Sequence, residues 1–142
     1  MATGAAALNI IPDRNYIPGV KDQNLKNLYD IVELAERRHF PVIVGTEMNA
    51  PGNKFVDSFE KAELAPLLPI FLKGAHIAYA HSVLQRQSGL GYLSAWAKKA
   101  FPTVAARNEF FEKLGRELRP EKEDGLRGLT AQASPAQLLG RI

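Results

Sequence analysis

Polar side chains that could bind a metal ion follow the most apolar run of the chain. Val42-Ile43-Val44 places three β-branched residues in succession, and Thr46, Glu47 and Asn49 come directly after them. A continuous apolar run bounded by turn residues is typical of a strand that is buried on both faces of a parallel sheet. Ligands of α/β proteins bind at the carboxyl ends of such strands. The sequence therefore favours a site at these three polar residues.

A second acid follows the other predicted strand. Leu8-Asn9-Ile10-Ile11 is a short apolar run that ends at a proline, and Asp13 lies just after it. Carboxyl ends of neighbouring parallel strands meet at one edge of the sheet, so the carboxylates of Asp13 and Glu47 could share a divalent cation or a proton there. Oxygen ligands suit a hard ion such as Mg²⁺, with Thr46 and Asn49 in support.

The same acids also fit a purely structural role. Glu47 can pair with Arg14 or Lys54, and Asp13 can cap a turn. Lys54 follows Pro51-Gly52-Asn53, which leads toward a helix whose N-terminus could hold an anion, although a plain turn is the favoured interpretation of this segment. From the sequence alone, both interpretations of these binding candidates remain open.

The elements that must position these residues form a βαβ pattern over residues 8–46. A helix is predicted from about Asp22 to about His39, where Pro41 ends it. Its apolar residues recur at steps of three and four and make one stripe: Leu25, Leu28, Ile31, Val32 and Ala35. The crossover between the two strands is expected to be right-handed. The fold class is therefore α/β at the start of the chain.

The rest of the chain is predicted to be helical. Helices are expected over residues 66–74, 75–87, 92–101 and 103–118. The adjacent Phe110 and Phe111 cannot both face the same way on one helix, which favours contact with another helix or a partner subunit and an exposed apolar patch. Residues 119–142 are rich in charged and small residues. We expect a single domain over 1–118 and a weakly ordered C-terminal tail over 119–142.

The segment from Phe40 to Asn49, preceded by a helix, resembles the closing part of metal-dependent hydrolases of the PHP (polymerase and histidinol phosphatase) and amidohydrolase kind. In those (β/α) barrels a late strand ends in Gly-Ser/Thr-Asp-x-His, whose Asp and His bind metal. Gly45-Thr46-Glu47-Met48-Asn49 is similar, position by position. Glu47 can still bind a metal ion, whereas Asn49 replaces the His and is a poor ligand for zinc-like ions. The resemblance covers residues 8–100 loosely and implies part of a barrel.

Two functions follow as hypotheses, and whether the chain is an enzyme stays open between them. The resemblance implies a segment or remnant of a PHP/amidohydrolase-like hydrolase that binds a divalent metal through Glu47 and Asp13 and is weak or inactive alone. The family's His-x-His pair is missing. The alternative is a non-catalytic helical interaction or oligomerisation module. Since two strands do not make a stable sheet, we expect a homo-oligomer or a second chain that completes it.

Composition limits the class of protein, its ligands and its cellular compartment. The 142 residues are 46% hydrophobic and 23% charged, as in an ordinary soluble domain, and the net charge of +3 is mild. Basic residues alternate with acids and form no stripe with stacking aromatics, so nucleic-acid binding is not expected. The absence of cysteine favours a reducing cytoplasm and excludes thiolate chemistry. Neither a signal peptide nor a membrane span is expected from the apolar runs.

Overall fold

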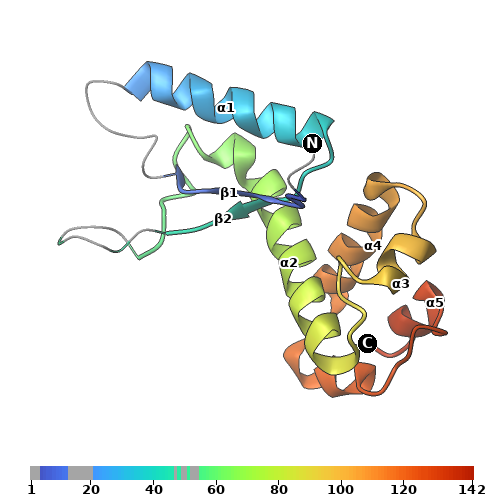
Figure 1. Cartoon of the computed structure of the whole chain (residues 1–142). Coiled ribbons are helices and arrows are strands. Elements are labelled where there is room, and N and C mark those ends of the chain that lie inside the picture. Colours follow the sequence, from blue (N-terminus) through green and yellow to red (C-terminus); the bar gives the residue numbers. More distant parts are fainter. Residues whose placement is uncertain (1–3, 13–20, 47, 49–50, 52–54) are drawn as a thin grey trace. The chain divides into compact units, whose positions relative to one another are not determined.

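A computed structural model describes residues 4–12, 21–46, 48, 51 and 55–142 of the chain. The chain divides into two compact units, Met1–Gly74 and Ala75–Ile142, which we call unit 1 and unit 2. Helix α2 (Leu68–Ser88) begins in unit 1 and ends in unit 2. The sequence predicted two helices that separate at Gly74, but α2 is continuous there (Figure 1).

Unit 1 begins with a parallel strand pair that a helix connects. Strand β1 (Leu8–Ile10) is followed by helix α1 (Lys21–Arg37) and strand β2 (Val42–Val44). The strands pair in parallel, with Leu8 opposite Val42 and Ile10 opposite Val44. The structure is thus mixed and mostly helical, with the predicted βαβ-like start followed by helices (Figure 1).

The turn after α1 directs the chain into β2. His39 has a φ of 56°, and the Phe40 amide donates a hydrogen bond of 2.8 Å to the carbonyl of Ala35. A residue in the left-handed backbone conformation followed by this hydrogen bond is a common helix C-terminus, in which the last carbonyl groups of the helix accept backbone N–H groups. Helix α1 therefore ends within two residues of the predicted end at His39.

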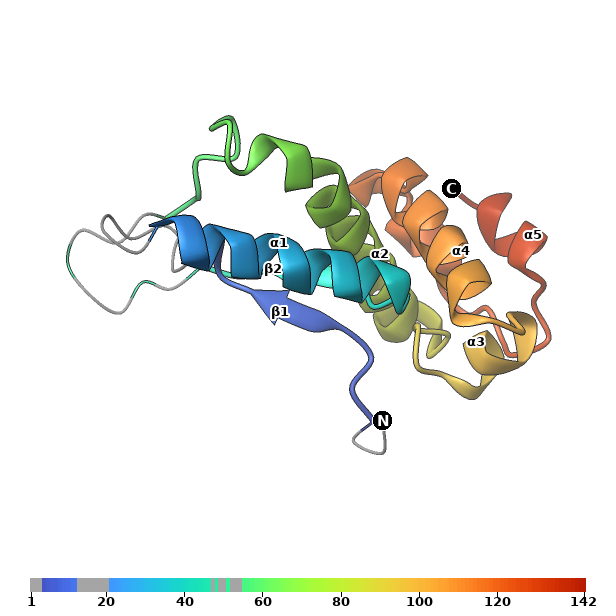
Figure 2. The ribbon, with the colours of Figure 1, turned by 90° about the horizontal axis from the view of Figure 1, so that it is seen from above.

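One face of the strand pair carries the core of unit 1. The pairing places Leu8, Ile10, Val42 and Val44 on the same face, where they pack in one core with residues of α1. Figure 2 shows α1 lying over β2, with β1 beside it. The buried residues of this core are Ile10, Leu28, Val32, Ala35, Val42, Leu64, Leu67 and Phe71. The last two come from η2 (Ala65–Leu67) and the start of α2.

The prediction that β2 is buried on both faces is wrong. Val42 is buried, but Val44 is only partly buried, and Ile43 on the opposite face is also partly exposed. Its neighbour Asn9 in β1 is exposed. The apolar run therefore reflects one well-covered face, and the other face of the pair keeps contact with solvent.

Unit 2 is built around aromatic side chains. Ser94 is the N-cap of helix α3 (Ala95–Ala100), and Thr103 is the N-cap of helix α4 (Val104–Glu117). The side-chain hydroxyl of each accepts a backbone N–H of the first turn. The clustered rings are Tyr92, Trp96, Phe101, Phe110 and Phe111.

Phe110 and Phe111 both lie in this cluster, with ring centroids 5.4 Å apart. Phe110 contacts Trp96, while Phe111 contacts Tyr92. Both side chains are buried, so the expected exposed patch at this pair is wrong, because Trp96 of α3 and Tyr92 of the preceding turn pack against them.

Residues 119–142 differ from the expected weakly ordered tail. They form the 3₁₀ helix η3 (Pro120–Leu126) and helix α5 (Pro135–Leu139), and Leu126 and Leu138 are fully buried. The Trp96 indole N–H donates to the carbonyl of Ala133 at 2.8 Å. The segment is therefore part of the folded core of unit 2.

The segment Ala65–Ser88 is long and apolar enough to cross a membrane by length and composition alone, with a mean hydropathy of 1.2 over its best window. Its apolar side chains Phe71, Ile77, Ala80, Val83 and Leu84 are buried within the protein. Since 39% of that window is buried within the protein, burial in the cores accounts for part of this apolar composition.

Candidate functional site

Most of the predicted site residues lie outside the described part of the chain. These are the metal candidates Asp13 and Glu47 and the binding candidates Arg14, Asn49 and Lys54. Thr46 is described and is exposed just beyond β2. The strands that precede Asp13 and Glu47 do lie side by side and in parallel, and the amide of Gly45 donates to the carbonyl of Ile10 at 2.8 Å.

No group of three or more His, Cys, Asp or Glu side chains suitable for a metal ion occurs within the described residues. His76 and His81 lie on α2. The Nδ1 atom of His81 accepts the backbone N–H of Tyr92 at 3.0 Å, which joins α2 to the segment that precedes α3. This bond gives His81 a structural role in unit 2.

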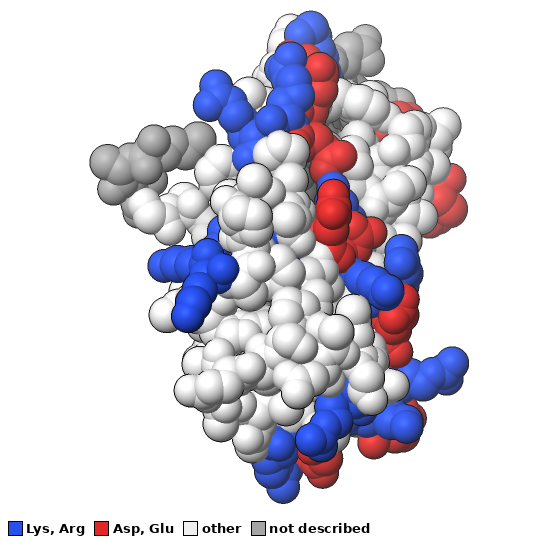
Figure 3. All heavy atoms as spheres, turned by 90° about the vertical axis from the view of Figure 1, so that its right-hand side faces the viewer, with Lys and Arg blue, Asp and Glu red and all other residues white. Residues whose placement is uncertain are grey.

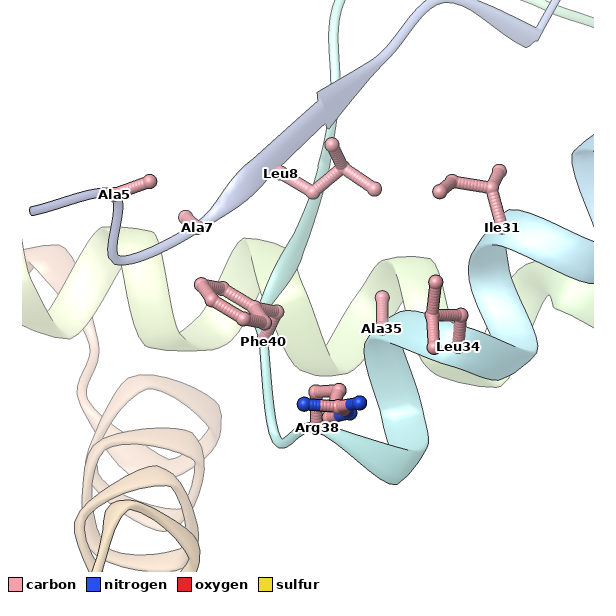
Figure 4. Close-up of a pocket in the computed structure, with 8 residues that line it drawn as sticks. All are labelled: Ala5, Ala7, Leu8, Ile31, Leu34, Ala35, Arg38 and Phe40. Atoms are coloured by element: carbon pink, nitrogen blue, oxygen red, sulfur yellow. The ribbon is translucent and has the colours of Figure 1, made fainter. Parts of the chain in front are cut away.

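A small apolar pocket of about 170 Å³ lies beside β1 (Figure 4). Strand β1 and the residues before it provide Ala5, Ala7 and Leu8, helix α1 provides the opposite wall, and Phe40 lies below them. Ile31 and Leu34 of that wall are 39% and 41% exposed, although both are large apolar side chains. The pocket therefore presents uncovered apolar surface to solvent.

The pocket adjoins a sheet edge that no described residue pairs with. The amide of Leu8 donates to the carbonyl of Pro41 at 2.9 Å, and the carbonyl of Ile10 accepts from Gly45. In a parallel pair, residues that alternate with these point their main-chain groups the other way. The N–H and C=O of Asn9 therefore point away from β2, at the outer edge of β1.

The other edge of the pair is covered. The main-chain groups of Val42 point away from β1, and the carbonyl oxygen of Val42 lies against Gly74 of α2. Of the two edges of this small sheet, α2 thus covers the one at β2. The edge at β1 is the one left for pairing within the described structure.

Charge at the pocket comes from Arg38, which lies at one end of it (Figure 4). The neighbouring Arg37 pairs with Glu33 at 3.5 Å, whereas Arg38 has no ion pair with another described residue. The pocket is therefore apolar along its length with a single cation at its end.

The remaining charged surface shows no continuous area of one sign in the view of Figure 3, where Lys and Arg side chains lie beside Asp and Glu. In unit 2 several of these charges form ion pairs, among them Arg116 with Glu112 and Arg127 with Asp124. Such a mixed surface is typical of solvated helix faces.

Sequence reasoning missed the pocket because it placed Ile31 in the inward stripe of α1. Leu34 was the available signal, because it is a large apolar residue that lies off that stripe, three residues after Ile31. Comparison with protein-family models, with curated proteins and with solved structures finds no match for this chain. The resemblance to PHP and amidohydrolase enzymes therefore stays a prediction.

Proposed function

We propose that this chain is a non-catalytic self-association module whose unit 1 joins another copy of the chain. The observation that carries the proposal is the outer edge of β1, which lies next to the apolar pocket and has no partner within the described structure. A two-stranded sheet is marginally stable alone, so additional strands stabilise it.

The sequence of this edge supports the proposal. Residues 4–11 contain no Lys, Arg, Asp or Glu, and the first proline is Pro12. Proteins that avoid pairing at an open edge place charges, prolines or bulges there. The edge of β1 lacks the first two of these devices over the strand itself, and exposed Ile31 and Leu34 add an apolar wall beside it.

Light scattering over a range of protein concentrations tests this proposal. We expect a dimer or larger species at roughly 100 µM that dissociates toward a monomer on dilution, because mass action governs assembly. A monomer throughout that range would overturn the proposed function.

A second candidate is a segment of a PHP/amidohydrolase-like metal-dependent hydrolase. The observation that favours it is the parallel pairing of β1 with β2, which brings the carboxyl ends of both strands to one edge. Asp13 and Glu47 each follow one of these strands by three residues. In this proposal they bind a divalent cation with Thr46 and Asn49, and a second chain supplies the missing ligands.

Calorimetric titration with Mg²⁺, Mn²⁺ and Zn²⁺ tests the second candidate. Binding should be present in the wild-type chain, absent in Glu47→Gln and retained in Glu60→Gln, which alters an exposed acid of the same unit. Absence of binding to the wild-type chain would exclude this candidate. Metal-dependent hydrolysis of a phosphate ester that is lost in Glu47→Gln would instead overturn the non-catalytic proposal.

A further inference from the structure

We infer that the second copy docks antiparallel along β1, so that two chains build one four-stranded sheet in the order β2-β1-β1-β2. This inference rests on the proposed self-association and names the surface that carries it. Its parts are the outward main-chain groups of Asn9, the apolar pocket, and the exposed stripe of α1.

The main chain of β1 is complementary to itself. With Asn9 of one copy opposite Asn9 of the other, each N–H can donate to the other residue's C=O, as in the hydrogen-bonded pairs of an antiparallel ladder. The same register places Leu8 of one copy opposite Ile10 of the second copy, and the reverse. Both side chains lie on the face that α1 covers, so apolar groups meet beside the pocket.

The position of α1 suits this arrangement. A two-fold axis perpendicular to the sheet keeps both α1 helices on the same face. Helix α1 packs on that face through Leu28, Val32 and Ala35, and its exposed Ile31 and Leu34 line the pocket beside β1, the strand next to the two-fold axis. The exposed stripes of the two α1 helices therefore face each other across the two-fold axis.

The residues that would face each other across the two-fold axis form one stripe on α1. Asn27, Ile31, Leu34 and Arg38 follow one another at steps of four, three and four, the spacing of side chains along a helix–helix contact. All four side chains are exposed in the single chain.

The charges of this stripe are compatible with two-fold symmetry. When antiparallel helices meet midway between Ile31 and Leu34, Arg38 of one copy faces Asn27 of the second copy. The Asn27 amide oxygen already accepts from Nε2 of Gln23 at 2.9 Å, and its second lone pair can accept from the guanidinium. Arg38 and Asn27 carry no like charges that would oppose each other. A second copy of this chain would therefore pair with the outer edge of β1, cover the apolar pocket and accept a hydrogen bond from Arg38.

A cysteine introduced at Asn9 tests the register directly, since the chain has no cysteine of its own. Cα atoms of a hydrogen-bonded antiparallel pair lie about 5.5 Å apart, within the range that a disulfide spans. We expect Asn9→Cys to give a covalent dimer on mild oxidation. Glu60→Cys, at another exposed position of unit 1, should stay monomeric on a denaturing gel.

Leu34→Glu tests the helix contact in the same protein. The side chain is exposed in the single chain, so the fold should persist, while an acid at the two-fold axis should weaken association at least tenfold. Leu72→Glu is the matched control, because Leu72 is an exposed leucine of unit 1 that lies outside the pocket.

The outcomes separate the two proposals. A wild-type oligomer that gives no Asn9→Cys cross-link and is unaffected by Leu34→Glu would overturn this geometry and leave the self-association intact. A wild-type monomer would overturn both. Circular dichroism melts of each variant establish that a change in assembly is not a loss of fold.

Discussion

A methyl group on Gly74 would lie 1.7 Å from the carbonyl oxygen of Val42. Cβ atoms in proteins keep well over 3 Å from such oxygens, so only glycine allows α2 to approach β2 this closely. The contact closes one edge of the strand pair. It also explains why a glycine stands in the middle of α2, where it costs about 1 kcal/mol of helix stability relative to alanine.

Gly74→Ala should therefore destabilise the chain, although alanine is the better helix former. Displacing β2 or α2 to admit the methyl group is expected to lower the free energy of unfolding by about 1–3 kcal/mol, as other overpacked sites do. Chemical denaturation measures this change. Gly140→Ala is the control, since its nearest contact would be 3.5 Å and its φ is −74°; equal stability of the two variants would contradict the close approach.

The second prediction concerns residues 119–142. Leu138→Ala should lower the free energy of unfolding by about 2–5 kcal/mol, because Leu138 is fully buried and its loss leaves a cavity. Leu93→Ala, at a leucine that is 50% exposed, should have a much smaller effect. If both variants melt like the wild type, the C-terminal segment contributes little to the core.

The two faces of β2 give the third prediction. Val42 is 1% exposed, whereas Ile43 points to the partly solvated face. Val42→Asp should unfold unit 1, since an unpaired charge would be buried, while Ile43→Asp should be tolerated far better. Thermal melts of the two variants, which differ only in the face that carries the charge, measure the contrast. Equal losses would mean that both faces are covered.

The sequence was sufficient to predict the βαβ-like start, because local signals agree there: three β-branched residues, a helical stripe and a proline between them. It was not sufficient to predict how many faces of β2 are covered, since an apolar run does not say where the covering helices lie. Burial of Leu126 and Leu138 also depends on a core that distant helices supply. Of the predicted site residues, Thr46 alone falls within the described structure.

The last prediction concerns a pH dependence in unit 2. The hydroxyl of Tyr79 donates to Oε1 of Glu123 at 2.9 Å, and Arg86 forms an ion pair with the same carboxylate. Burial, together with the hydrogen bond to Glu123 and the charge of that carboxylate, raises the pKa of Tyr79 from 10.0 to about 12. These contacts join α2 to η3.

The sign of the effect follows from linkage. Between pH 10 and pH 12 the folded chain holds the Tyr79 proton while the unfolded chain has lost it, so the free energy of unfolding falls as the pH rises. The stabilising contribution of Tyr79 is fully present below pH 10 and is lost as the pH passes 12. We expect the advantage of the wild type over Tyr79→Phe in denaturant titrations to shrink across this interval. Glu123→Gln keeps a hydrogen-bond acceptor but removes the negative charge, so in this variant the pH interval over which stability falls should be narrower. If the stability difference between wild type and Tyr79→Phe is the same at every pH, the hydrogen bond to Glu123 does not raise the pKa of Tyr79.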